Sequence, residues 1–395
     1  MADNVIEGVT VIPGGGRDAI PDAVVTIDAH GVVEGIEAHA AAAGDRYLVP
    51  AGVDLHLDNL QQRRRPRATV ALDHAAVISV LDAECAAAGL GTVCVAARCE
   101  DSPRKGIAID DAAVLAAVLE DLAPLLSCDW RLHARVELTD DGAVDALRDV
   151  LAESSRVALI SMMETSVDRS RFSSMAETQA FYAQDWGVSE AEVAAMFTVD
   201  DEQLRRTAER RAEVAGLAHG HGVVLATHDD RTEAHIEEAF ALGATVAEFP
   251  LTLAAAQRAH ALGMKVVLGA PNALRGRSTS AGNVLAADAI AAGACDVLCS
   301  DYLPSALHSA PHVLARDHGV PLGVGVDLVS TNPAAVLGLA PVTIEVGRPL
   351  TASLRRVRQF APGSAEQIAH VGTALWRDGQ LVFTRESVNN TVSVP

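Results

Sequence analysis

Aromatic residues are scarce in this chain of 395 residues: Phe, Trp and Tyr make up 3% of the sequence, whereas hydrophobic residues as a class reach 49%. Alanine, valine and leucine must therefore fill most of the core, as is common where helices pack on a parallel sheet. The length suits one (β/α)8 barrel of roughly 250 residues together with a smaller attached domain.

An excess of positive charge is also missing, because the formal net charge is −21. A chain this acidic is repelled by nucleic acid and by anionic membranes, so we expect neither as a partner. The sequence has no uncharged apolar run of about 18 residues. It also lacks a basic and apolar N-terminal segment, so we expect no membrane span and no secretion signal.

The six cysteines form no CxxC pair, and most lie in apolar runs such as GTVCVAAR. This pattern favours buried, reduced thiols over disulfides or metal ligands. We therefore expect a cytoplasmic protein. Composition leaves the oligomeric state open, and a homo-oligomer remains an option.

Short apolar strands alternate with alanine-rich helical runs between residues 49 and 344. The predicted strands are 53–56, 92–97, 131–137, 157–163, 223–228, 245–249, 265–269 and 296–300. Three of the later helical runs end in glycine, as helix C-termini often do. Eight strand–helix units in succession predict a closed (β/α)8 TIM-type barrel, with a doubly wound open sheet as the alternative.

The two ends of the chain have a different character. Residues 1–48 and 345–395 contain strand-like runs broken by turn signals, among them GGG and the DG of ALWRDGQLVF. They predict a small β-sandwich domain formed by both termini. The long gap between 163 and 223 predicts an inserted helical segment.

Ionisable residues follow the apolar strand cores of the predicted barrel, where the active site of such a barrel lies. The residues at these strand ends are His56, Asp58, Glu137, His228, Glu248 and Asp301. His56 and Asp58 are two residues apart and point to the same side of a strand. Alone, a pair of this kind more often has a structural role. The ionisable residues at the other strand ends favour a binding site for a divalent metal ion, with zinc as the first choice.

Each strand-end residue has a predicted role. His56, Asp58, His228 and Glu248 are candidate ligands for one or two metal ions. Glu137 is a fifth candidate, and pairing with an arginine such as Arg135 is an equally good interpretation. A carboxylate at Asp301 suits general acid–base catalysis on a water molecule activated by the metal.

Arginines gather in two loops that follow predicted strands, QQRRRPR and LGAPNALRGRSTSAGN. Guanidinium groups match the geometry of phosphate oxygens, so these loops predict a small, anionic and phosphorylated substrate. A solvated basic loop is the alternative. The predicted substrate-binding residues are Arg63, Arg65, Arg67, Asp229, Asn272, Arg275, Ser280 and Asn283.

Several of these segments resemble the PhnM branch of the amidohydrolase superfamily. The resemblance runs from about 48 to 310 and includes AGVDLHLDNL, THDDRTEAHIEEAFALGATVAEFPLT and GAPNALRGRSTSAGN. It implies a metal-dependent hydrolase that cleaves α-D-ribose 1-methylphosphonate 5-triphosphate and releases pyrophosphate. It further implies metal ligands at His56, Asp58, His228 and Glu248, with Asp301 catalytic.

The sequence departs from the family pattern at three places. Leu57 replaces a threonine, Leu81-Asp82 replaces a His-Asp pair in what we expect to be a loop, and 164–169 replace an Asp-His-Ser-Pro-Gly-Gln motif. These changes leave open a second hypothesis, an amidase or deaminase that cleaves a C–N bond. A third is a metal-binding protein without catalytic activity.

Overall fold

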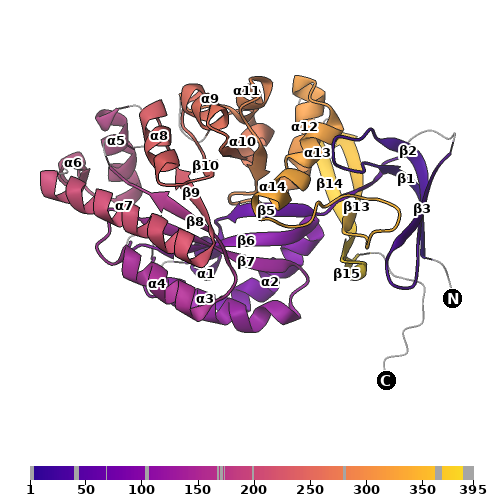
Figure 1. The fold of residues 1–395 in the computed structure, drawn as a ribbon, viewed down its shortest axis with the longest axis horizontal. Coiled ribbons are helices and arrows are strands. Elements are labelled where there is room, and N and C mark those ends of the chain that lie inside the picture. The colour runs from indigo at the N-terminus through magenta and orange to yellow at the C-terminus, as the bar shows by residue number, and fades with distance from the viewer. Residues whose placement is uncertain are drawn as a thin grey trace.

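The computed structural model describes residues 4–39, 44–67, 69–102, 106–166, 169, 172, 174–197, 200–278, 282–360 and 367–385. Ser280 lies outside the described residues. The chain forms an eight-stranded and a seven-stranded sheet, which lie side by side in Figure 1.

The eight-stranded sheet is a closed parallel barrel. Its strands are β5 (Gly52–Leu57), β6 (Leu90–Cys99), β7 (Asp129–Glu137), β8 (Val157–Met163), β9 (Val224–His228), β10 (Val246–Glu248), β11 (Lys265–Gly269) and β12 (Val297–Cys299). Neighbours in the chain are neighbours in the sheet. The first and last strands meet where the Asp301 amide donates to the His56 carbonyl (2.9 Å) and the Asp58 amide donates to the Asp301 carbonyl (2.6 Å). The predicted barrel is confirmed, and ring closure excludes the open sheet.

Helices surround the barrel, as Figure 1 shows. They are α2 (His74–Ala88), α3 (Asp111–Leu122), α4 (Ala143–Glu153), α7 (Asp201–His221), α8 (Glu233–Ala241), α9 (Leu253–Ala261), α11 (Ala286–Ala291) and α12 (Ala306–His318). Their inner faces are mainly Ala, Val and Leu, and they join the strands in one large core. The short helices are α1 (Leu60–Arg64), α10 (Ala270–Arg275), α13 (Leu322–Asp327) and α14 (Thr331–Val336).

The expected insertion between β8 and β9 contains α5 (Met175–Trp186) and α6 (Glu190–Phe197) before α7. These two helices share a small core of their own, in which Tyr182, Val193 and Phe197 are buried. The Tyr182 and Phe197 rings lie 5.3 Å apart. A sequence poor in aromatics thus places several of them in this one segment.

The seven-stranded sheet joins the two ends of the chain. Its strands are β1 (Asn4–Val11), β2 (Ile20–Ile27), β3 (Val33–Ala38), β4 (Arg46–Pro50), β13 (Ala352–Phe360), β14 (Gln367–Arg377) and β15 (Gln380–Thr384). Strand β4 connects the halves, because it pairs with β1 on one side and with β13 on the other. The domain limits, 1–48 plus 345–395 and 49–344, stay a prediction. Among the described residues, no helix is long and apolar enough to cross a membrane.

Candidate metal centre

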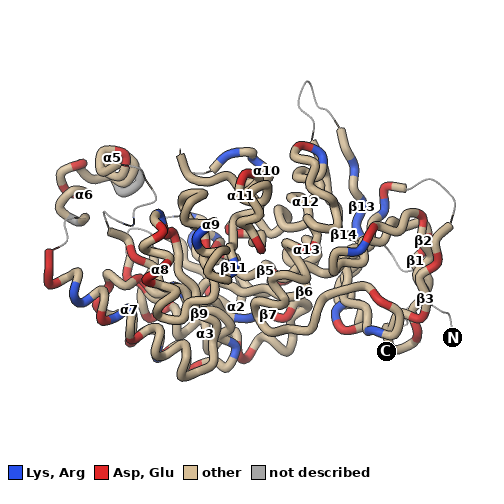
Figure 2. The backbone as a smooth tube through the Cα atoms, turned by 45° about the horizontal axis from the view of Figure 1, so that its top comes forward, with Lys and Arg blue, Asp and Glu red and all other residues tan. Residues whose placement is uncertain are grey.

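A pocket of about 930 Å3 opens at the carboxyl ends of the barrel strands. Of the described residues, five arginines line it, although the protein is strongly acidic: Arg63, Arg98, Arg135, Arg169 and Arg275. Figure 2 shows basic positions in the chain beside α10 and α11. Four carboxylates, those of Asp58, Glu164, Asp229 and Asp301, line the same pocket, so the arginines lie among acidic side chains.

Left-handed backbone follows three of the strands at this rim. Asp229, Phe249 and Asp301 have φ values of 61°, 50° and 55°. This conformation is uncommon for residues other than glycine and costs roughly 1–3 kcal/mol each. Such strain tends to persist where the surrounding structure fixes a functional site, and here it lies immediately beside the strand-end side chains.

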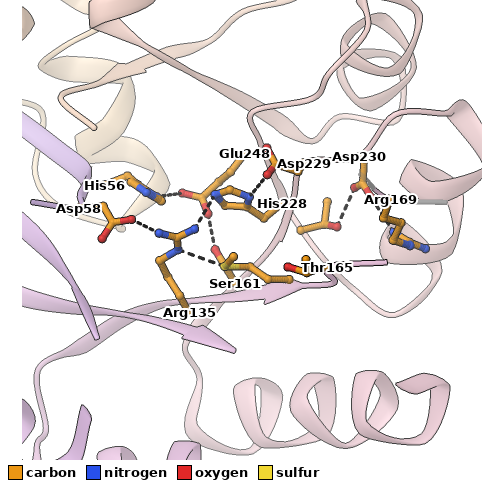
Figure 3. A network of polar contacts seen from close by, with 12 residues as sticks. His56, Asp58, Arg135, Ser161, Thr165, Arg169, His228, Asp229, Asp230 and Glu248 are labelled. Carbon is orange, nitrogen blue, oxygen red and sulfur yellow. Dashed lines mark hydrogen bonds and ion pairs between the residues drawn. The ribbon is translucent and has the colours of Figure 1, made fainter. Parts of the chain in front are cut away.

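His56, His228 and Glu248 form a buried cluster at the base of the pocket. Each offers one ligand atom, and these atoms all lie within 4.8 Å of one another. The imidazole Nδ1 of His56 is 3.2 Å from Glu248 Oε1. The three side chains come from β5, β9 and β10 and converge in Figure 3. Two imidazoles and a carboxylate are a donor set typical of zinc and similar divalent ions.

Burial sets the ionisation of this cluster. It lowers the pKa of His56 to about 4, so the imidazole is neutral near pH 7 and can donate a lone pair to a metal. Burial alone would raise the pKa of Glu248, but His133 and His56 hold that pKa well below its usual range. Both groups are therefore in the form that binds a cation.

Glu248 is oriented by two side chains from other strands of the barrel. The Ser161 hydroxyl of β8 donates to Glu248 Oε2. His133 Nε2 of β7 lies 3.3 Å from the same oxygen and 2.6 Å from Ser161 Oγ. Hydrogen bonds behind a ligand fix its direction and tune its metal affinity.

Asp58 lies beside this cluster but is not one of its members. Its carboxylate accepts a hydrogen bond from Arg98 Nε at 3.0 Å and is also bound by Arg98 Nη2 and Arg135 Nη1. Burial would raise the pKa of Asp58, but Arg135 and Arg98 outweigh it and hold the pKa below its ordinary value. The structure thus joins Asp58 to two guanidinium groups.

Glu137 is also outside the cluster. One carboxylate oxygen accepts from the Thr165 amide (3.0 Å) and the Thr139 hydroxyl (2.7 Å), and the other accepts from the Thr165 hydroxyl (2.6 Å). Glu137 therefore ties the end of β7 to the end of β8. The expected alternative, a pair with Arg135, is not formed either, because Arg135 contacts Asp58.

Asp301 lines the same pocket as His56 and His228. Burial raises its pKa to about 6, and the nearby charge of Asp58 acts in the same direction. A carboxyl group with a pKa near the working pH can both accept and release a proton.

The predicted substrate residues divide into two groups. Those that line the pocket are Arg63, Asp229, Asn272, Arg275 and Asn283. The Asn272 side-chain amide bonds to the Val284 carbonyl and the Ala286 amide and so ties α10 to the start of α11.

Arg65 and Arg67 are exposed and do not line the pocket within the described part of the chain. The Arg65 side chain lies against Gly106 instead. The arginine-rich loop turns outward after α1, and sequence spacing could not reveal that direction.

No site role was predicted from the sequence for Arg98, Arg135, Arg169 or Ser161. Arg98 and Arg135 are direct partners across β6 and β7, so both reach Asp58. A charged residue near the end of an otherwise apolar strand was the available signal. It is ambiguous without the strand register.

Two of the three departures from the family pattern lie in different surroundings. Arg169 donates to Asp230 Oδ1 at 2.7 Å and lies 3.3 Å from Glu164, so Glu164 and Arg169 contribute to an ion-pair network beside the pocket. Leu81 and Asp82 instead lie inside helix α2, which corrects the expected loop. Asp82 accepts hydrogen bonds from the Cys128 amide and from Trp130 Nε1.

No family model matches the chain. The chain is 32% identical over 345 residues to the alpha-D-ribose 1-methylphosphonate 5-triphosphate diphosphatase of Escherichia coli K12. The matched region covers 85% of this chain and 88% of that protein.

Solved structures of lower identity share the fold. The 5-methylcytosine deaminase from Klebsiella pneumoniae is 14% identical, with a TM-score of 0.59 and coverage of 97% of this chain and 98% of that chain. The N-acetyl-D-glucosamine-6-phosphate deacetylase from Mycobacterium smegmatis is 15% identical, with a TM-score of 0.56 and coverage of 95% and 99%. At these identities the likeness concerns architecture alone.

Proposed function

Because this chain belongs to the family of α-D-ribose 1-methylphosphonate 5-triphosphate diphosphatases, we propose that it cleaves a phosphoanhydride bond and releases pyrophosphate. These diphosphatases are hydrolases of the amidohydrolase superfamily. The proposed substrate is of the ribose phosphonate 5-triphosphate type. The observation that carries the proposal is the gathering of arginines around a His-His-Glu cluster in a protein of net charge −21. Guanidinium groups suit phosphate oxygens.

His56, His228 and Glu248 would hold the divalent metal, for which zinc is our proposal. Their fit rests on two imidazoles and an ionised carboxylate with ligand atoms within 4.8 Å of one another. When bound, the metal supplies Lewis-acid polarisation and makes water more acidic. Ser161 and His133 keep the Glu248 carboxylate turned toward the two imidazoles.

Asp301 is the proposed proton acceptor and donor. In the reaction, a water oxygen bonds to phosphorus, the bridging P–O bond breaks, and pyrophosphate leaves. Asp301 Oδ takes the proton from the attacking water and returns it to the departing group. Arg63 and Arg275, which both line the pocket, would hold phosphate oxygens, and Asp229 and Asn283 would orient the rest of the substrate.

We also propose a cytoplasmic location. All six cysteines are free, and five of them are buried. Reduced thiols of this kind are the norm in a reducing compartment.

A substrate panel tests the proposed reaction. The metal-loaded protein should release pyrophosphate and the matching monophosphate in equal amounts from ribose-based 5′-triphosphates. Arg275→Met should raise KM, because it removes a pocket guanidinium. Arg205→Met, a change on the exposed face of α7, should leave KM unchanged. Cleavage of cyclic or acyl amides without pyrophosphate release from any triphosphate would establish the C–N hydrolase hypothesis instead.

A further inference from the structure

A positively charged group lies directly beside the candidate metal ligands. Arg135 Nη2 is 3.4 Å from His228 Nε2, and Arg135 Nη1 donates to Asp58. Figure 3 shows the guanidinium of β7 between Asp58 on one side and the His228–Glu248 pair on the other. Arg135 therefore occupies the space between the ligand cluster and the next carboxylate of the site.

The surroundings hold this guanidinium in place. Arg135 is buried, and its Nε lies 3.1 Å from Met163 Sδ. Arg98 also donates to the Asp58 carboxylate, and Arg98 Nη1 donates to Glu100 Oε1 at 2.9 Å. The two arginines and two carboxylates form an ion-pair chain along the β6 and β7 ends. Each ion pair in this chain helps to fix the position of the next side chain.

A second divalent ion would have no suitable place here. An ion held between Asp58 and His228 would have to displace the Arg135 guanidinium, which already occupies that position with a positive charge that arginine does not lose. The nearby carboxylates are also engaged, since Asp58 binds two arginines and Glu137 is bound by Thr139 and Thr165.

We infer that the site binds a single divalent metal ion and that Arg135, held by Asp58, is its second cation. This inference rests on the proposed metal-dependent function and specifies the number of metal ions that the function uses. The guanidinium supplies, without a second ion, a positive charge at the pocket floor that an anionic substrate can approach. Asp58 then positions Arg135 and is not a metal ligand.

Metal counting tests the inference independently of any substrate. Protein stripped with a chelator and reloaded with Mn2+ should hold one ion per chain by elemental analysis. Its electron paramagnetic resonance spectrum should be that of an isolated ion. Two ions per chain with a spin-coupled spectrum would overturn the inference, and so would no bound metal at all.

Three arginine variants test the number of bound ions further. Arg135→Met removes the cation between Asp58 and His228 and leaves Asp58 paired with Arg98 alone, so it should raise the capacity from one ion to two. Arg98→Met and Arg135→Lys keep a cation between Asp58 and His228 and should stay at one. A folded Arg135→Met protein that still binds one ion would contradict the inference. If Arg135→Met does not fold, the wild-type count decides alone.

The two proposals fail in different ways. One ion per chain without pyrophosphate release would sink the proposed diphosphatase activity and leave the single-metal arrangement intact. Two ions per chain with pyrophosphate release would do the opposite.

Discussion

At the scale of single residues, the candidate centre depends on how neighbours set the direction and charge of each ligand. Glu248 is buried, yet it stays ionised because Ser161 and the adjacent imidazoles stabilise the carboxylate. An unpaired carboxylate at the same depth would be too costly to keep charged. The residues behind Glu248 should therefore matter for metal binding.

Ser161→Ala should weaken metal binding by roughly 10- to 100-fold, the usual effect of losing a group that orients a ligand. The reason is that the change removes the hydroxyl that donates to Glu248. Competition with a metal indicator measures the affinity. Ser309→Ala, which alters an exposed hydroxyl bonded within α12, is the matched control. Equal affinities for the two variants would contradict the assigned role of Ser161.

Asp301→Asn should lower kcat by about 100- to 10,000-fold, because it removes the proposed proton acceptor. Burial raises the pKa of Asp301 to about 6, and a base must be ionised to accept a proton. Wild-type kcat/KM should accordingly fall as the pH drops through about 6. The residual activity of Asp301→Asn should lack that acidic limb.

Asp145→Asn on exposed α4 is the control for Asp301→Asn and should keep the wild-type pH profile. An unchanged kcat for Asp301→Asn would show that another group transfers the proton.

At the scale of secondary-structure elements, the barrel strands were predictable and the partners of their end residues were not. Most of the strands contain a short apolar run with a polar residue near its end, several of them follow a glycine-ended helix, and such patterns are local. The partners of Asp58 and Glu137 depend on which side chains adjacent strands place at the same height. The pairing of Arg98 with Arg135 across β6 and β7 is therefore visible only in the folded chain.

Helix α2 is stabilised in part by a residue that lies far away in the sequence. Its last carbonyls need donors, and Arg355 of β13 supplies one by donating to the Ala88 carbonyl at 2.6 Å. Arg355 is buried, with 2% of its surface exposed. This contact ties the terminal sheet to the barrel at the end of a helix.

Arg355→Met should lower the free energy of unfolding by about 1–3 kcal/mol, because it leaves a buried carbonyl without its donor. Urea denaturation followed by circular dichroism measures the change. Arg358→Met alters an exposed arginine of the same strand and should have little effect. If the two variants were equally stable, Arg355 would not contribute through this contact.

At the scale of the whole molecule, the contact between barrel and terminal sheet contains a group of imidazoles. His312 of α12 lies 4.4 Å from His370 of β14 and 5.2 Å from Tyr47 of β4, measured between ring centroids. His308 and the buried Arg355 are the other charged or titratable groups in this setting. None of these groups is acidic, so protonation of an imidazole here gains no counter-ion.

Acid should therefore loosen this contact. Burial lowers the pKa of His312 to about 4, whereas an unfolded histidine titrates near 6.5. Between these values the unfolded chain binds more protons, so the stability that is present above about pH 6.5 is lost as the pH falls toward 4. His312→Gln should make the decline in unfolding free energy between pH 7 and 4.5 shallower.

His318→Gln, at an exposed position of the same helix, is the control for His312→Gln and should keep the wild-type slope. Denaturant midpoints taken across that pH range give both slopes. A His312→Gln slope identical to that of the wild type would place the acid sensitivity elsewhere.

The most direct test of the central claim is pyrophosphate release measured before and after removal of the metal. We predict that chelator-treated protein releases no pyrophosphate from a ribose-based 5′-triphosphate, and that added zinc restores the release in the wild type but not in Glu248→Gln. Undiminished release from metal-free protein, or from Glu248→Gln, would contradict a metal-dependent phosphoanhydride hydrolase at this site.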